Sequence, residues 1–232
     1  MELNIKENDK ILVVAPHQDD ETIGCGGLLA MYGKKCDVLL LTDGRLGNAK
    51  MYKDLDELVK IRNNELDKTC KIVSVNKITR LPIQNEQLTK HIDIVKNVDI
   101  KEYDYIFIPY RKDMHPDHKV CYKIFKSMIS SQKAKAQLIE YEVWTPLETP
   151  TYILDISDII ETKKKMLKEY KSQLKEKDYL GATLGLNKYR GMFIEKKYGE
   201  AYMHSIYSGL KVKLYESLPD SAKDKIKNMI SK

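Results

Sequence analysis

Two short polar clusters carry three of the five histidines of this 232-residue chain. The first cluster reads Pro-His-Gln-Asp-Asp-Glu at residues 16–21, and the second reads Asp-Met-His-Pro-Asp-His at residues 113–118. Three adjacent carboxylates beside a histidine repel one another unless a positive charge lies among them. A divalent metal ion would supply that charge, so the two clusters favour a catalytic metal site.

The spacing within the clusters indicates how a metal would be held. His17 and Asp20 are separated by two residues, which a turn or a helix start presents to one point, and His118 can supply a third ligand. Two imidazoles and one carboxylate, with water in the open position, are the pattern of a catalytic zinc. Asp19 would face the water as general base, and His115 could reach the same cavity from the other side. We therefore expect Zn²⁺, or another divalent metal, at this place.

A dinucleotide-binding loop is the competing interpretation of the first cluster, because glycines and a second strand follow it. The glycines at 24, 26 and 27 do not match the Gly-x-Gly-x-x-Gly pattern. The acidic residues 19–21 would also lie at the helix N-terminus, where the pyrophosphate of a nucleotide binds. Anionic groups facing each other there are unfavourable without a bridging metal, so we exclude this class of site.

Alternating apolar runs and helical patterns predict the scaffold that positions both clusters. Buried strands are expected at 11–15, 36–41, 71–75, 103–109, 138–144 and 151–156, with helices at 22–32, 54–69, 86–97, 117–130 and from 158. This order is typical of an α/β domain with a Rossmann-like, mostly parallel sheet and helices on both faces. Each cluster follows one of the strands, and ligands bind at the carboxyl ends of strands in such sheets. The two clusters should therefore meet in one crevice.

The end of the chain has a weaker pattern. After residue 173 no clear period is present and three glycines follow, so we expect a single domain with an irregular C-terminal extension. We place this domain at residues 1–205 and a helical tail at 206–232. The tail is basic and amphipathic, and its apolar face would pack on the domain or on a second subunit of a homo-oligomer. Peripheral contact of the tail with an anionic membrane surface stays open.

Composition limits the classes of function. Forty basic and 34 acidic residues give a net charge of +6, and the Lys-rich stretches are typical of solvated helix faces rather than of a nucleic-acid-binding surface. No window approaches a transmembrane length of about 18 apolar residues, and the N-terminus has no signal-like run. The four cysteines form no Cys-x-x-Cys pair, which favours a reducing compartment. We expect a cytoplasmic protein with no nucleic-acid partner and no transmembrane segment.

Taken together, the two clusters resemble the motifs of the PIG-L/LmbE-type zinc-dependent N-acetylglucosaminyl deacetylases. The resemblance extends over most of residues 11–205. Similar segments lie at 42–44 (Thr-Asp-Gly), 61–65 (Ile-Arg-Asn-Asn-Glu), 170–173 and 186–191. One position departs from the family pattern, because Gln18 stands where proline is usual. We expect this departure to change the stiffness of the loop and not the binding of a metal.

The resemblance implies a role for each matching residue. Three residues would be the zinc ligands: His17, Asp20 and His118. Asp19 would be the general base, and His115 would stabilise the oxyanion or protonate the leaving amine. Asp117 would orient one of the ligand histidines, and Arg62 matches an arginine that contacts substrate. Asp117 could instead favour the positive end of its helix, and Arg62 could pair with Glu65 on a helix surface.

The family's reaction is removal of acetyl groups from N-acetylglucosamine-containing glycolipids, thiol precursors and antibiotics. The resemblance thus implies hydrolysis of the N-acetyl group of an N-acetylglucosamine or related N-acyl amino-sugar conjugate, by metal-activated water with Asp19 as base. Two alternatives stay open: a zinc amidase or esterase with a non-sugar substrate, and a non-catalytic carbohydrate-binding protein that retains its metal. The sequence distinguishes neither a small-molecule from a lipid-linked substrate nor Asp19 from His115 as the acid for the leaving amine.

Overall fold

The computed structural model describes residues 3–175, 177–205, 218–219 and 221–223. The strands are β1 (Ile11–Ala15), β2 (Cys36–Leu40), β3 (Lys77–Arg80), β4 (Tyr105–Pro109), β5 (Gln137–Tyr141), β6 (Tyr152–Asp155) and β7 (Gly199–His204). They form one sheet in the order β3-β2-β1-β4-β5-β7-β6. The first five strands in this order are parallel, whereas β7 runs antiparallel to both of its neighbours.

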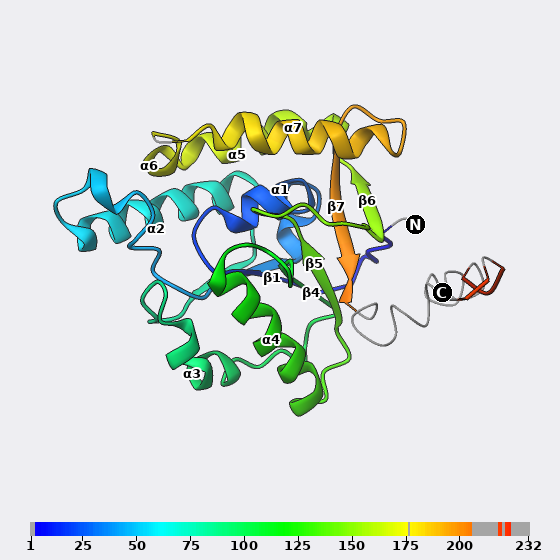
Figure 1. Ribbon diagram of the computed structural model, residues 1–232, viewed down its shortest axis with the longest axis horizontal. Helices are drawn as coiled ribbons and strands as arrows, with labels where there is room; N and C mark the ends of the chain where they lie inside the picture. The colour runs from blue at the N-terminus through cyan, green and yellow to red at the C-terminus, as the bar shows by residue number, and fades with distance from the viewer. Residues whose placement is uncertain (1–2, 176, 206–217, 220, 224–232) are drawn as a thin grey trace.

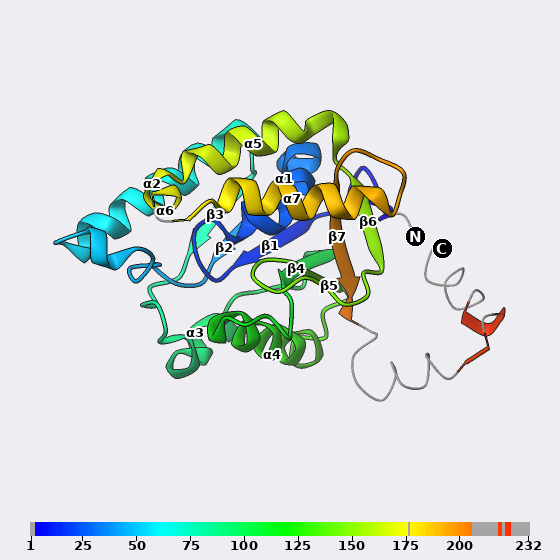
Figure 2. The same cartoon turned by 45° about the horizontal axis from the view of Figure 1, so that its top comes forward.

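Helices cover both faces of the sheet (Figures 1 and 2). One face carries α1 (Asp20–Tyr32), α2 (Leu55–Ile72), α5 (Ile160–Glu169), α6 (Lys171–Leu174) and α7 (Tyr179–Met192). The other face carries α3 (Ile92–Lys96) and α4 (Pro116–Ser131). Helix α5 packs over α1 and α2, and α7 packs against β7 and α5. The expected α/β domain, with a mostly parallel sheet between two helical layers, is confirmed.

Strand β1 shows why the central strands are apolar throughout. Its alternate side chains enter two separate cores, because successive side chains of a strand point to opposite faces. Ile11 and Val13 pack with residues of α1 and α2, whereas Leu12 and Val14 pack with residues of α3 and α4. A strand covered on both faces needs apolar residues at every position, which is the pattern that the sequence shows there.

The strand order reverses direction between β1 and β4. From β1 the chain continues outward to β2 and β3, whereas β4 is followed by β5 on the other side. The loops that leave the carboxyl ends of β1 and β4 therefore diverge and leave a crevice, which is the usual ligand site of open α/β sheets. The two polar clusters belong to these two loops and to the helices that follow them.

The third strand differs from the sequence expectation. It lies at Lys77–Arg80 and not at 71–75, because α2 continues to Ile72. The chain then turns, and the backbone N–H of Asn76 donates to the Cys36 carbonyl at 2.9 Å, which begins the pairing with β2. The short run at 71–75 is apolar enough for a strand, but α2 extends one turn further than its periodicity indicates.

The irregular extension expected after residue 173 is also corrected, because that segment contains α7 and β7. Asp178 caps α7, since its carboxylate accepts the backbone N–H of Gly181 at 2.7 Å. A Cβ at Gly191 would lie 2.7 Å from the Lys196 carbonyl oxygen, so the chain folds back closely over this glycine. The glycines weaken the helical pattern in the sequence, whereas here one of them allows tight tertiary packing.

The predicted tail at 206–232 lies outside the described residues, apart from 218–219 and 221–223. Its packing and the boundary at residue 205 stay predictions, as does the cytoplasmic location. Among the described residues, no helix is both long and apolar enough to cross a membrane.

Candidate active site

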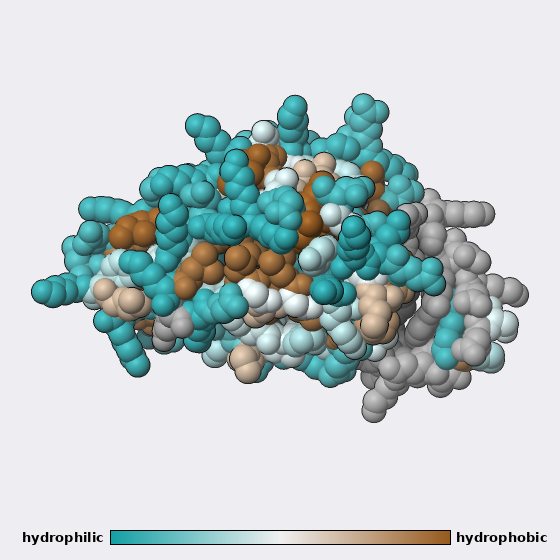
Figure 3. All heavy atoms as spheres, turned by 90° about the horizontal axis from the view of Figure 1, so that it is seen from above, coloured by the Kyte–Doolittle hydropathy of each residue, from teal (hydrophilic) through white to brown (hydrophobic). Residues whose placement is uncertain are grey.

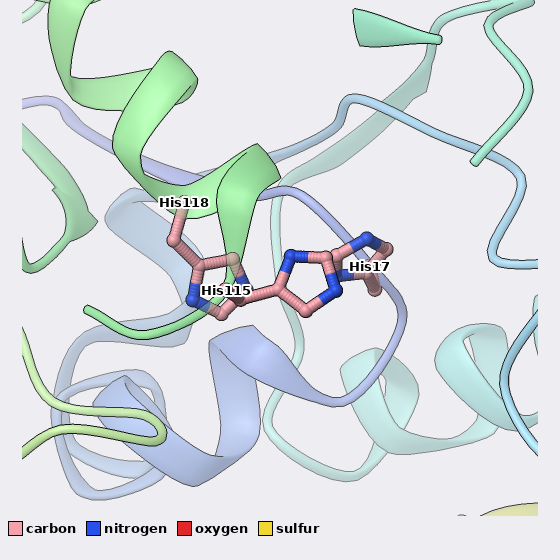
Figure 4. Close-up of side chains that lie close together, drawn as sticks. All are labelled: His17, His115 and His118. Carbon is pink, nitrogen blue, oxygen red and sulfur yellow. The ribbon is translucent and has the colours of Figure 1, made fainter. Parts of the chain in front are cut away.

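The two polar clusters meet at the crevice between β1 and β4. His17 lies in the loop after β1, Asp20 opens α1, and His118 lies in the first turn of α4. Figure 4 shows His17, His115 and His118 close together, the first on the loop after β1 and the others at the start of α4. Each of these histidines offers a ring nitrogen within 4.8 Å of those of the other two. The sequence-predicted site residues from both loops are therefore brought together.

Asp20 lies between two imidazoles. Its Oδ2 is 3.1 Å from His17 Nδ1 and 3.1 Å from His118 Nε2, and all three side chains are buried. Ligand atoms in a tetrahedral zinc site, at about 2.0–2.2 Å from the ion, lie about 3.3 Å from one another. The two distances from Asp20 and the donor types of the three atoms thus fit a divalent metal. That they bind one stays a prediction.

Two further carboxylates contact the outer nitrogens of the same histidines. Asp117 Oδ2 lies 3.1 Å from His17 Nε2, and Asp113 Oδ1 lies 3.1 Å from His118 Nδ1. Asp113 is itself held in place, because its other oxygen accepts the backbone N–H of Trp144 at 2.9 Å. Carboxylates in this position keep a proton on the outer nitrogen and leave the inner one free for a metal.

His115 is held differently from the other two histidines. It is the N-cap of α4, and its Nδ1 accepts the backbone N–H of Asp117 at 3.2 Å. Burial and the neighbouring imidazoles lower the pKa of His115 to about 4, which favours the neutral ring. A neutral imidazole that accepts at Nδ1 carries its proton on Nε2, so this nitrogen can donate a hydrogen bond, although His115 also belongs to the group of three histidines whose ring nitrogens could hold a metal. We therefore treat His115 as a donor beside the three proposed ligands.

Asp19 has an unusual backbone conformation. Its φ of 110° lies in a region that residues other than glycine rarely adopt. Arg62 supports this conformation, because one guanidinium nitrogen donates to the Gln18 carbonyl at 2.5 Å and to Asp19 Oδ2 at 3.3 Å. The other terminal nitrogen donates to the Gly44 carbonyl at 2.6 Å, and Arg62 is only 2% exposed. Arg62 therefore stabilises the loop after β1 through these hydrogen bonds. Its contact with substrate stays a prediction.

The two adjacent carboxylates have different electrostatic surroundings. Burial raises the pKa of Asp19 to about 7, against the opposing effect of the Arg62 guanidinium. Burial would also raise the pKa of Asp20, but His118 and His17 hold it well below its usual range. A carboxylate whose pKa lies near neutrality is suited to exchange protons, whereas one that stays ionised is suited to bind a cation.

Gln18, at the position that departs from the motif, is fully buried. Its Nε2 donates to the Asp43 carbonyl at 3.0 Å and to Asn63 Oδ1 at 3.1 Å. The side chain thus ties the loop after β1 to the loop after β2 and to α2. A proline would stiffen the backbone at this position, whereas glutamine restrains the loop through hydrogen bonds.

Asn85 is a site residue that the sequence did not single out. Its Nδ2 lies 3.2 Å from His17 Nε2 and 3.4 Å from Asp117 Oδ2. Asn85 follows β3 at the same edge of the sheet as the two polar clusters, but a strand at 71–75 would end ten residues before it. A sequence prediction that placed β3 at 77–80 would have identified Asn85 as a site residue, because Asn85 would then follow the end of a strand. Asp113 belongs to the second cluster, but the sequence did not decide whether it lines the site or ends a turn.

Residues 12–129 match the family model described as PIG-L, GlcNAc-PI de-N-acetylase. A probable N-acetyl-alpha-D-glucosaminyl L-malate deacetylase 2 of Bacillus subtilis (strain 168) is 23% identical over 71% of this chain and 83% of its own length. The diacetylchitobiose deacetylase of Thermococcus kodakarensis is 28% identical over 72% of this chain and 71% of its own. The structure of N,N'-diacetylchitobiose deacetylase from Pyrococcus horikoshii shares the fold, with a TM-score of 0.73, 22% identity, and coverage of 87% of this chain and 86% of that one.

Proposed function

The chain belongs to the PIG-L family of deacetylases, and on that premise we propose that it is a zinc-dependent hydrolase that removes the acetyl group from an N-acetyl amino-sugar conjugate. The observation that carries the proposal is the convergence of His17, Asp20 and His118, with the carboxylate of Asp19 next to them. Both curated relatives are named as deacetylases of N-acetylated sugar compounds, which supports the substrate class.

His17, Asp20 and His118 would hold the ion, which leaves a coordination position for water or substrate. A zinc ion in such a site polarises the acetamide carbonyl and lowers the pKa of a water molecule. Asp117 and Asp113, each 3.1 Å from an outer imidazole nitrogen, would keep the two ligand histidines in orientation.

Asp19 is the proposed general base. It would accept a proton from the water as the water oxygen bonds to the acetamide carbon. Arg62 and the left-handed backbone keep its carboxylate beside Asp20 while leaving it out of the three-atom ligand set. A buried base needs no rearrangement of solvent when it takes up the proton, which favours the transfer.

His115 would act on the other side of the reacting carbon. Its Nε2–H would donate a hydrogen bond to the carbonyl oxygen as negative charge develops there. The C–N bond then breaks, the amine takes the proton that Asp19 accepted from the water, and acetate and a free amino sugar leave. The sequence left Asp19 and His115 open as this acid, and the neutral ring of His115 favours Asp19, because only a protonated imidazole could supply the proton.

The experiment that tests the proposal measures acetate release and metal content on the same purified protein. The substrates are a methyl N-acetylglucosaminide, N,N'-diacetylchitobiose, N-acetylglucosaminyl-phosphatidylinositol and a nucleotide sugar, each with and without a chelator. We expect acetate release from at least one substrate, its loss with the chelator, and its recovery when Zn²⁺ is added back. A non-sugar N-acetyl amide serves as the control substrate.

Two results would contradict the proposal. Protein that holds one equivalent of zinc but releases no acetate from any amino sugar would favour a binding role. Release from the non-sugar amide alone would indicate a general amidase.

The His118→Ala variant should lose the metal, because one of the three proposed ligands is removed. Stoichiometric zinc in that variant would refute the ligand assignment.

A further inference from the structure

Glu21 ends the first polar cluster and has no role in the proposed hydrolysis. Its side chain is fully buried in the first turn of α1. Its Oε1 accepts hydrogen bonds from the Thr22 hydroxyl, at 2.5 Å, and from the Tyr170 hydroxyl. Its Oε2 accepts the backbone N–H of Asp19 at 3.1 Å. Burial of a carboxylate is unfavourable unless donors face its oxygens, and these three donors supply that compensation.

Tyr170 holds Glu21 from a distant part of the chain. It lies between α5 and α6, 149 residues from Glu21, and it is only 2% exposed. Seen from the side of α5 and α7, the molecule is mostly hydrophilic, with apolar surface gathered along the middle of this face (Figure 3). Glu21 and Tyr170 are both buried and contribute little to that surface. The orientation of the Glu21 carboxylate is therefore set by its packing and by the tyrosine hydroxyl, and not by solvent.

The peptide unit between Gln18 and Asp19 is held at both of its polar groups. Its carbonyl oxygen accepts a guanidinium N–H of Arg62 at 2.5 Å, and its N–H donates to Glu21. A peptide unit is planar, and its C=O and N–H point in opposite directions. The two hydrogen bonds together therefore restrain the rotation of this unit.

The peptide unit after Asp19 is held by α1. The Asp19 carbonyl accepts the backbone N–H groups of Thr22 at 3.0 Å and of Ile23 at 2.8 Å. With the units on both sides restrained, the φ of Asp19 is determined by its surroundings, at 110°. A strained conformation of this kind persists only where the surroundings over-determine it. Loss of the Glu21 acceptor would let the preceding unit rotate toward an unstrained φ and would redirect the Asp19 side chain.

We propose that Glu21 is a positioning residue for the base of the reaction. Its hydrogen bond to the Asp19 N–H keeps the φ of Asp19 positive and thereby directs the Asp19 carboxylate. Glu21 acts through this one acceptor and exchanges no proton with the substrate. The inference rests on the proposed function for the role of Asp19, whereas the backbone restraint can be observed without catalysis.

Two substitutions of similar size separate the acceptor from the charge. Glu21→Gln loses the charge but keeps an oxygen for the Asp19 N–H, whereas Glu21→Met fills the space without an acceptor. We expect Glu21→Met to lower kcat for acetate release about tenfold or more, with KM changed by less than about twofold. Glu21→Gln should retain at least about a third of kcat, and both variants should keep their zinc.

The exposed Glu57→Met on α2 is the matched control and should leave kcat unchanged. Equal kcat values for Glu21→Met and Glu21→Gln would refute the role of the acceptor. If Glu21→Met does not fold, Tyr170→Phe tests the same link, because it removes only the hydroxyl that holds Glu21. It should lower kcat about threefold with KM unchanged, and an unchanged kcat would contradict the proposal.

A double substitution distinguishes positioning of the base from a general loss of structure. If Glu21 acts through the Asp19 carboxylate, Glu21→Met should change the residual kcat by less than about twofold once Asp19→Asn is present. A loss of about tenfold in both backgrounds would show that Glu21 acts on the structure in general, and would refute the positioning role.

Crystal structures of the two Glu21 variants test the restraint directly. We expect a positive φ at Asp19 in Glu21→Gln, and a rotated Gln18–Asp19 peptide unit with a negative φ in Glu21→Met. An unchanged φ in Glu21→Met would overturn the inference and leave the proposed function intact. Unaltered protein that releases no acetate from any amino sugar would refute the proposed function, and with it the catalytic meaning of Glu21, whereas the change of φ would still establish the restraint.

Discussion

Asp19 combines a buried carboxylate with a backbone conformation that costs about 1–3 kcal/mol for a residue other than glycine. Such a conformation persists only where the surroundings enforce it. Here Arg62 donates to the Gln18 carbonyl and to Asp19, and the Gln18 side chain donates to the Asp43 carbonyl in the loop after β2. The carboxylate of Asp19 thereby contacts Arg62, whereas that of Asp20 contacts His17 and His118, although the two residues are adjacent. In the proposed mechanism, these different partners leave Asp20 to bind the cation and Asp19 to move a proton.

Replacing Asp19 by asparagine should separate catalysis from metal binding. Asparagine tolerates a positive φ and retains an oxygen for Arg62, so the loop should keep its shape. We expect kcat for acetate release to fall by about a hundredfold or more, because the base is lost, while the zinc content stays unchanged. Metal analysis and kcat on one preparation check this. Nearly full turnover would show that another group is the base.

Replacing Gln18 by alanine should destabilise the loop that carries the ligands. The change leaves the Asp43 carbonyl and Asn63 Oδ1 without the donor that they share. We expect the free energy of unfolding in urea to fall by about 1–3 kcal/mol. Gln84→Ala, at an exposed position, is the matched control and should change it by less than about 0.5 kcal/mol. Equal effects of the two substitutions would exclude an anchoring role for Gln18.

Helix α1 is joined to α5 and β7 by a buried ion pair. Lys163 Nζ lies 2.5 Å from Glu200 Oε1 and donates to the Ile23 carbonyl at 2.9 Å. Glu200 also accepts the backbone N–H groups of Gly27 and Leu28, which follow a break in the helical backbone at Cys25. The pair therefore satisfies backbone groups that the kink of α1 frees from the helix. Because α1 begins at Asp20, this packing also holds the helix that carries the proposed ligand.

Breaking this pair should be strongly destabilising. Lys163→Met would leave Glu200 as an uncompensated buried charge, so we expect the free energy of unfolding to fall by about 3–5 kcal/mol. The neighbouring Lys164→Met removes an exposed pair with Glu161 and should have no measurable effect. Urea unfolding of both variants provides the comparison. If the two variants unfolded at the same urea concentration, the ion pair would not be a structural link.

The molecule as a whole is built around the strand reversal between β1 and β4. The proposed ligands come from both sides of it, because His17 and Asp20 follow β1 whereas His118 follows β4. A metal bound by all three would link two parts of the chain that are about a hundred residues apart. Such a site forms in the folded protein and not in the unfolded chain, so metal binding and folding are coupled.

Zinc should therefore raise the thermal stability of the whole protein. At a free concentration of about 100 times Kd, a ligand specific for the native state adds about 2.7 kcal/mol to the free energy of unfolding. We expect Tm to fall when a chelator removes the metal and to recover with Zn²⁺. His118→Ala should abolish the recovery, whereas His91→Ala, at an exposed position, should retain it. A Tm that does not respond to zinc in the unaltered protein would contradict the coupling.

The fold could be predicted where the pattern is local. The continuous apolar run at β1 predicts a strand covered on both faces, and it lies between two cores. The convergence of His17, Asp20 and His118 also followed from the sequence, because polar residues directly after parallel strands share one edge of the sheet. The end of α2 and the helix α7 did not follow, since the apolar run at 71–75 and the glycines near α7 have several local interpretations.

Sequence alone predicted which residues form the candidate site, because the side chains that can bind a cation or move a proton stand in two short motifs after apolar runs. The packed fold decided which distant groups orient them. Arg62 is 44 residues from Gln18, and Asn85 is 68 residues from His17, yet both pairs are in contact. The contact between Tyr170 and Glu21 likewise joins residues that are 149 positions apart. Local residue patterns in the sequence indicate conformational preference and burial. Contacts between residues that are far apart in the sequence form only when the helices and strands pack together.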